Sequence, residues 1–118
     1  MRRFVLVAAA VLTAMVAPRA QTPPPAAALA GCSVADLQRR APADTTITGA
    51  TAESAGAKPA HCLVDGHVTV PGNTVNFRLA LPASWNGKFY FQGVGGLGGA
   101  IGSLEVGLAR GYASASTD

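Results

Sequence analysis

Glycine dominates residues 93–102 (GVGGLGGAIG), which follow an aromatic stretch near the C-terminal end of this 118-residue chain. Within this segment Gly93, Gly95 and Gly98 have the spacing GxGxxG. Glycine lets a backbone adopt a positive φ and approach a ligand without the obstruction of a Cβ. The pattern therefore predicts a loop whose backbone N–H groups bind a negatively charged or developing oxygen.

Two kinds of chemistry use a glycine loop that lies between a strand and a helix. In a dinucleotide-binding turn the loop admits a pyrophosphate, and an acid at the end of the next strand, here Asp118, holds a ribose. In an α/β-hydrolase a glycine-rich stretch after an early strand exposes a backbone N–H that stabilises the oxyanion of ester cleavage. A loop that only packs beneath a helix is the alternative to both.

The N-terminal residues have the layout of a secretory signal peptide. Arg2 and Arg3 precede an apolar run over residues 4–17, which is too short to span a bilayer. We assign residues 1–20 to this leader and residues 21–31 (QTPPPAAALAG) to a low-complexity spacer. Beyond the leader six basic residues balance six acidic ones, so the mature chain has no charge excess for nucleic acid or for an anionic membrane.

Cys32 and Cys62 are the only cysteines of the sequence. In an exported chain an even number of cysteines predicts a disulfide. A metal site formed by Cys62 and its neighbour His61 is an alternative, although no spacing typical of metal ligands accompanies them. Residues 29–32 (LAGC) also have the composition of a bacterial lipoprotein box, so lipidation of Cys32 stays open.

Periodicity and turn residues predict the secondary structure of residues 32–118, which form one small domain. The predicted strands are residues 45–48, residues 63–70 with an interruption at Asp65–Gly66, residues 74–81, residues 88–92 and residues 112–117. Residues 49–59 are predicted as a loop, and residues 71–73 (PGN) as a turn. In residues 74–81 the apolar side chains alternate, which predicts one buried face.

Two helices complete the predicted elements. Ser33 and Asp36 form a capping box ahead of a short helix over residues 34–40. A second helix carries Ile101, Leu104 and Leu108 on one side and stops at Gly111. A hairpin followed by a strand, a glycine loop, a helix and a further strand is the opening of an α/β sheet.

Several strings of residues together resemble the tannase/feruloyl esterase family. They are residues 59–66 (PAHCLVDG), residues 77–82 (FRLALP), residues 85–89 (WNGKF), the glycine loop and residues 110–118 (RGYASASTD). The resemblance extends over residues 32–118, and the WNGKF string followed by glycines is specific in combination with the His-Cys pair. The dinucleotide hypothesis does not explain the WNGKF string, so we favour the esterase.

The resemblance implies an exported serine esterase with an α/β-hydrolase fold. Members of the family cleave carboxylic esters of aromatic acids, of the feruloyl or galloyl type, and carry a large inserted lid that often holds calcium. The two early cysteines of the family are typically bonded to each other, which matches Cys32 and Cys62. Gly96 matches the position whose backbone N–H serves the oxyanion hole, and Val94 interrupts what is an unbroken glycine run in many members.

The catalytic triad of the family has no counterpart in this sequence. The family's nucleophile lies in a later G-C-S-x-G-G segment, followed by its Asp and His, and no serine of this chain has such surroundings. We therefore expect the N-terminal portion of an α/β-hydrolase, with the early strands, the oxyanion loop, the first helix and the next strand. The chain alone is expected to be inactive and to bind no cofactor or metal.

The whole protein is expected to be secreted or periplasmic. Its partner would be a small aromatic ester, with no nucleic acid and no membrane once the leader is removed. The remaining alternatives are a dinucleotide-binding unit that uses Gly93, Gly95, Gly98 and Asp118, and a small secreted binding module.

Overall fold

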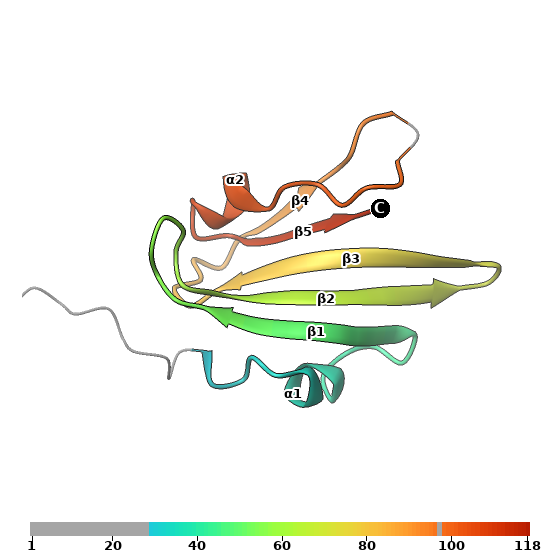
Figure 1. Ribbon diagram of the computed structural model, residues 1–118, viewed down its shortest axis with the longest axis horizontal. Coiled ribbons are helices and arrows are strands. Elements are labelled where there is room, and N and C mark those ends of the chain that lie inside the picture. Colours follow the sequence, from blue (N-terminus) through green and yellow to red (C-terminus); the bar gives the residue numbers. More distant parts are fainter. Residues whose placement is uncertain (1–28, 97) are drawn as a thin grey trace, which may run out of the picture.

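The part of the chain that the computed structural model describes, residues 29–96 and 98–118, forms a mixed five-stranded sheet with two short helices (Figure 1). The strands are β1 (Thr45–Glu53), β2 (His61–Val70), β3 (Asn73–Pro82), β4 (Phe89–Gln92) and β5 (Ala113–Thr117), and the helices are α1 (Val34–Gln38) and α2 (Glu105–Leu108). The strand order is β1-β2-β3-β5-β4. Neighbouring strands are antiparallel except β4 and β5, which are parallel. The predicted leader and most of the spacer lie outside the described residues.

The parallel pair determines the path of the chain after β4. Parallel neighbours need a crossover connection, and α2 lies in it, packed on β5, β3 and β4. The helix sits close to the sheet because residue 107 is glycine: a Cβ there would lie 2.1 Å from Ser114 Oγ and 2.8 Å from Tyr90 Cβ. This strand–helix–strand unit is the α/β element that the sequence predicts, although the helix is shorter than expected and excludes Ile101.

The hairpin of β2 and β3 is built around a two-residue turn. Val70 pairs with Asn73, so Pro71 and Gly72 form the connection. Proline followed by a glycine at φ 76° is the combination that a type II turn uses. The predicted turn and the strand after it are confirmed.

Two expectations about β1 and β2 are wrong. β2 runs through Asp65–Gly66 without interruption, and β1 continues to Glu53 although residues 49–53 were expected in a loop. Both strands are long because they pair along their length, up to Glu53 opposite His61. This pairing outweighs the low strand propensity of the glycines and alanines in these strands, which are Gly49, Ala50, Ala52 and Gly66. The irregularity in this region is instead a register shift in β1, between Ile47 and Gly49.

Apolar side chains are buried on both faces of the sheet. On one face Ile47, Cys62 and Val64 form a cluster against which Leu37 of α1 packs. On the other face Ala80 is fully buried beneath two leucines of the crossover segment, Leu104 and Leu108. The alternation in β3 predicts only the first of these faces, because alanine gives no hydrophobic signal comparable to leucine.

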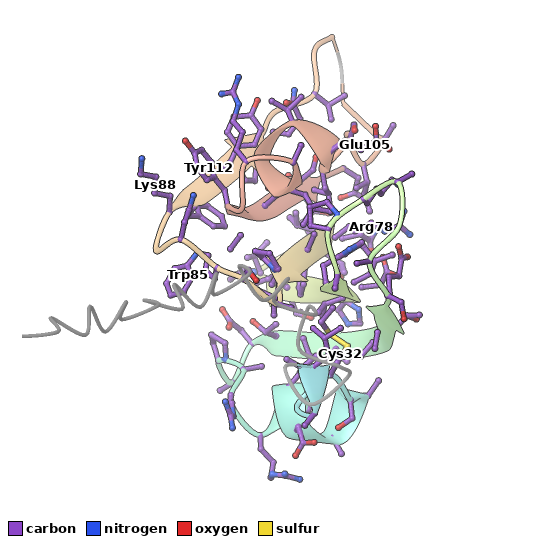
Figure 2. All side chains as sticks on the ribbon, turned by 90° about the vertical axis from the view of Figure 1, so that its left-hand side faces the viewer. Cys32, Arg78, Trp85, Lys88, Glu105 and Tyr112 are labelled. Atoms are coloured by element: carbon purple, nitrogen blue, oxygen red, sulfur yellow. A yellow bond between two sulfur atoms is a disulfide. The ribbon has the colours of Figure 1, made fainter. Side chains whose placement is uncertain are left out.

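The N-terminal segment is attached to the sheet at two points. Ser33 Oγ accepts a hydrogen bond from the Asp36 N–H at 3.1 Å, which confirms the predicted cap of α1. Cys32 and Cys62 are joined by a disulfide, drawn in yellow in Figure 2. Closing a loop of 30 residues stabilises a fold by roughly 3–4 kcal/mol in the chain-entropy model. Because both sulfurs are used in this bond, Cys62 is not available to a metal, and Cys32 is not available to a lipid.

We expect Gly66→Ala to lower the free energy of unfolding by about 1–3 kcal/mol, the usual effect of overpacking a closed site. A Cβ at this position would lie 2.5 Å from the carbonyl oxygen of Thr46 and 2.6 Å from the ring of Phe77. Gly56→Ala is the control, because no atom lies within 4 Å of a Cβ there. Urea denaturation of the two oxidised variants measures the difference. Equal transition midpoints would contradict the prediction.

Candidate functional site

The glycine loop leaves the end of β4 and returns beside the end of β5 (Figure 1). Gly98 marks the return, since a Cβ there would lie 4.0 Å from the backbone carbonyl carbon of Asp118. Gly93, Gly95 and Gly96 are exposed to solvent on the outgoing side. The structure therefore presents the loop at the edge of the sheet, beyond its parallel pair of strands.

Gly96 combines the properties that an oxyanion donor needs. Its φ is 77°, a conformation that residues with a Cβ rarely adopt, and a Cβ at this position would meet open space. Among the described residues, no acceptor is hydrogen-bonded to the Gly96 N–H. An N–H in this state is able to donate to an oxygen of a ligand that approaches the loop.

Val94 is the one residue with a side chain among residues 93–96 (GVGG) at the start of the loop. One methyl group of its side chain, Cγ2, lies 3.3 Å from the position that a Cβ on Gly102 would occupy. The side chain thus turns toward the returning arm of the loop and is 39% exposed. Valine at this position packs the loop against itself.

The end of β4 fixes the start of the loop through side chains. The Tyr90 hydroxyl donates to Gln92 Oε1 at 2.7 Å, and Gln92 Nε2 donates to the carbonyl oxygen of Gly93 at 3.0 Å. Tyr90 is also one of the two residues on which Gly107 of α2 packs, together with Ser114. The first residue of the loop is therefore tied to the crossover helix as well as to the strand.

The WNGK string has a structural explanation that the sequence does not reveal. The Trp85 indole N–H donates to the Lys88 carbonyl at 2.7 Å, and Asn86 Nδ2 donates to the Arg110 carbonyl at 2.8 Å. The Lys88 ammonium lies 5.6 Å from the centre of the Tyr112 ring, and Figure 2 shows the two side chains together. The first contact closes the turn before β4, and the other two join this turn to the turn before β5, so the string positions the two parallel strands.

Asp118 does not have the surroundings of a ribose-binding acid. Its carboxylate accepts hydrogen bonds from the backbone N–H of Asn76 at 2.9 Å and from Asn76 Nδ2 at 2.6 Å. These bonds, the side-chain one first, lower the pKa of the Asp118 carboxyl from its ordinary value. The helix α2 begins only at Glu105, several residues after Gly98, so the loop does not open a helix as a dinucleotide-binding turn does.

His61 is buried and hydrogen-bonded within its own segment. Its Nδ1 lies 2.7 Å from the carbonyl oxygen of Pro59, and its Nε2 lies 3.4 Å from a carboxylate oxygen of Glu53. Across residues 29–96 and 98–118, no group of three or more His, Cys, Asp or Glu is placed to hold a metal ion. His67 is partly exposed on β2.

No helix in the described part of the chain has the length and apolar character needed to cross a bilayer.

The known proteins to which this chain is similar include enzymes that are named for ester hydrolysis. No protein-family model matches the chain. The chain is 34% identical to the mono(2-hydroxyethyl) terephthalate hydrolase of Piscinibacter sakaiensis, in a match that covers 55% of this chain and 13% of that protein. Among solved structures it is similar to an esterase from Aspergillus oryzae (TM-score 0.64, 16% identity) and to feruloyl esterase B from the same fungus (TM-score 0.61, 20% identity).

The structural matches cover 74% and 76% of this chain and 21% of each esterase. The chain therefore has the fold of a section of these enzymes, and its mixed sheet belongs to an α/β-hydrolase-like fold. The resemblance to the tannase/feruloyl esterase family, predicted from the sequence, is confirmed by these relatives.

We expect Asn76→Ala to raise the pKa of the Asp118 carboxyl toward its ordinary value, because the variant removes the side-chain donor. Since the folded pKa is lowered, the interaction stabilises the fold above the ordinary aspartate value of about 3.9 and is lost as the pH falls through the folded value. NMR titration of the carboxyl carbon measures the change. Asn73→Ala is the control, since Asn73 binds the Thr74 N–H instead. The same Asp118 titration in both variants would contradict this account.

Proposed function

We propose that the chain is the N-terminal portion of an exported serine carboxylic-ester hydrolase that acts on aromatic-acid esters, of the feruloyl or galloyl type. In this proposal the Gly96 N–H is one of the oxyanion donors. The single observation that carries it is Gly96 itself, with a positive φ, an open face and an N–H that no described residue accepts.

The relatives support the substrate class. One is named for hydrolysis of a terephthalate monoester and another for feruloyl esters, and both names describe esters of aromatic acids. A section that covers 13% or 21% of such proteins supplies only part of their machinery. The activity of the whole protein therefore enters as a proposal.

The chemistry assigned to the loop is electrostatic. When a serine oxygen attacks the ester carbonyl, the C=O π electrons move onto the oxygen, and negative charge develops there in the tetrahedral intermediate. A backbone N–H fixed beside this oxygen stabilises the charge without reorganising, and loss of one such donor typically lowers kcat about 10²–10³-fold. Glycine at position 96 supports this role because it leaves the approach to the N–H open.

In this proposal the nucleophile comes from outside the described residues. Ser114 and Ser116 are fully buried, and Ser33 caps α1. No serine in the described segments lies within hydrogen-bonding distance of a histidine, which activation by a general base would require. The second oxyanion donor, normally the N–H after the nucleophile, would come from the same missing segment.

The edge of the sheet supports a larger domain. β4 is an edge strand, and the side chains of Phe89 and Phe91 on it are 63% and 52% exposed. Large aromatic side chains on an open edge are covered in stable proteins by further structure. The β4 edge is where we place the next strands of the hydrolase.

Export is part of the same proposal. The disulfide between Cys32 and Cys62 supports an oxidising compartment, secreted or periplasmic. Calcium would belong to the lid of the whole enzyme.

Reading the DNA beyond codon 118 tests the proposal. An open frame that encodes a G-C-S-x-G-G segment followed by an Asp and a His supports it. A stop codon directly after codon 118 in the source genome would contradict it.

We expect the 118-residue chain, purified alone, to show no hydrolysis of methyl ferulate, methyl gallate or a p-nitrophenyl ester above background. The physical reason is that an oxyanion donor without an activated serine gives only weak residual catalysis. Gly96→Val is assayed beside the unchanged chain. Turnover that disappears in this variant would show that the chain carries, or borrows from a partner chain, a nucleophile that we have not found.

A further inference from the structure

Ser116 is a fully buried polar residue near the C-terminal end of β5, next to the glycine loop. Its hydroxyl donates to the carbonyl oxygen of Gln92 at 2.8 Å and accepts from the backbone N–H of Gly102 at 2.8 Å. Gln92 is the last residue of β4, and Gly102 closes the glycine-rich stretch. One hydroxyl therefore connects the two ends of the loop.

The returning end of the loop fits closely around this hydroxyl. A Cβ on Gly102 would lie 2.9 Å from Ser116 Oγ and 3.1 Å from Gln92 Cγ, so only glycine brings its N–H into this position. A segment so rich in glycine has large backbone freedom when its ends are not fixed. The two bonds of Ser116 reduce this freedom at both ends simultaneously.

We propose that Ser116 is a positioning residue that fixes the glycine loop and thereby the direction of the Gly96 N–H. The inference rests on the proposed function for the identity of the bound oxygen, whereas the effect on the loop is independent of it. Ser116 is not a nucleophile, because its oxygen is buried and its proton is bound to a carbonyl.

Ser114 provides a matched control on the same strand. It is equally buried, but its hydroxyl lies 3.4 Å from the carbonyl oxygen of its near neighbour Tyr112 and beneath Gly107 of α2. Removing either hydroxyl takes one oxygen from the interior of the sheet. Of these two serines, Ser116 is the one whose hydroxyl is hydrogen-bonded to both ends of the loop.

The first experiment measures the loop in the full 118-residue chain by NMR. In Ser116→Ala we expect amide exchange at Gly102 to become about tenfold faster relative to the β2–β3 hairpin, as loss of one buried hydrogen bond implies. We also expect the order parameter of the Gly96 N–H to fall. In Ser114→Ala we expect both the exchange at Gly102 and the order parameter at Gly96 to stay unchanged. If Ser116→Ala does not fold, Ser116→Cys takes its place, because the larger sulfur keeps the connectivity of the side chain and weakens both bonds.

The outcomes decide the proposal. Exchange that accelerates equally in the loop and the hairpin would overturn it, because Ser116 would then stabilise only the fold. Faster exchange at Gly102 with an unchanged order parameter at Gly96 would also overturn it, since the loop would hold its direction without the serine.

The second experiment uses the protein as its source produces it, with methyl ferulate as substrate. Ser116→Ala should lower kcat about tenfold and leave KM within about twofold, the pattern of an interaction made in the transition state. A raised KM with unchanged kcat would overturn the positioning role. If the unchanged protein cleaves no ester, the proposed function fails, and the NMR experiment still decides whether Ser116 orders the loop.

Discussion

Phe89 to Gln92 of β4 lie in register beside Ala113 to Ser116 of β5, and the two strands run in the same direction. Parallel strands cannot be joined by a tight turn, so the chain must leave β4, cross over the sheet and return. The glycine loop and α2 are the two parts of this crossover. The parallel pair thus places a glycine-rich segment at the edge of the sheet and fixes both of its ends.

Two further contacts hold this pair in place. The turn before β4 is bonded to the turn before β5 through Asn86 and Arg110. Helix α2 is held against both strands because Gly107 has no side chain. On the opposite face the Cys32–Cys62 disulfide attaches the N-terminal segment to β2. An oxyanion donor needs such rigidity, since stabilisation by a fixed dipole is lost when the dipole must reorient.

The backbone supplies the chemistry of the candidate site, and the side chains supply its geometry. Gly96 offers an N–H, whereas Gln92, Tyr90 and Ser116 act on the loop from the strands beneath it. The esterase relatives share this fold over about a fifth of their length. In the proposed function this division lets a section of the sheet supply one oxyanion donor, while the rest of the enzyme supplies the catalytic triad.

The sequence by itself determined the features that depend on local chemistry. The cap at Ser33, the turn at Pro71–Gly72 and the last residues of β4 and β5 follow from neighbouring residues, and the pairing of two cysteines follows from their number. Only the tertiary structure decided the rest, because it depends on partners distant in sequence. Pairing with β2 extends β1 to Glu53, and burial beneath α2 makes Ala80 a core residue. Because β5 lies beside β4, the hydroxyl of Ser116 reaches both ends of the glycine loop. Small residues such as Ala80 and Ser116 give no recognisable signal in the sequence, so their roles become visible only when the strands are paired.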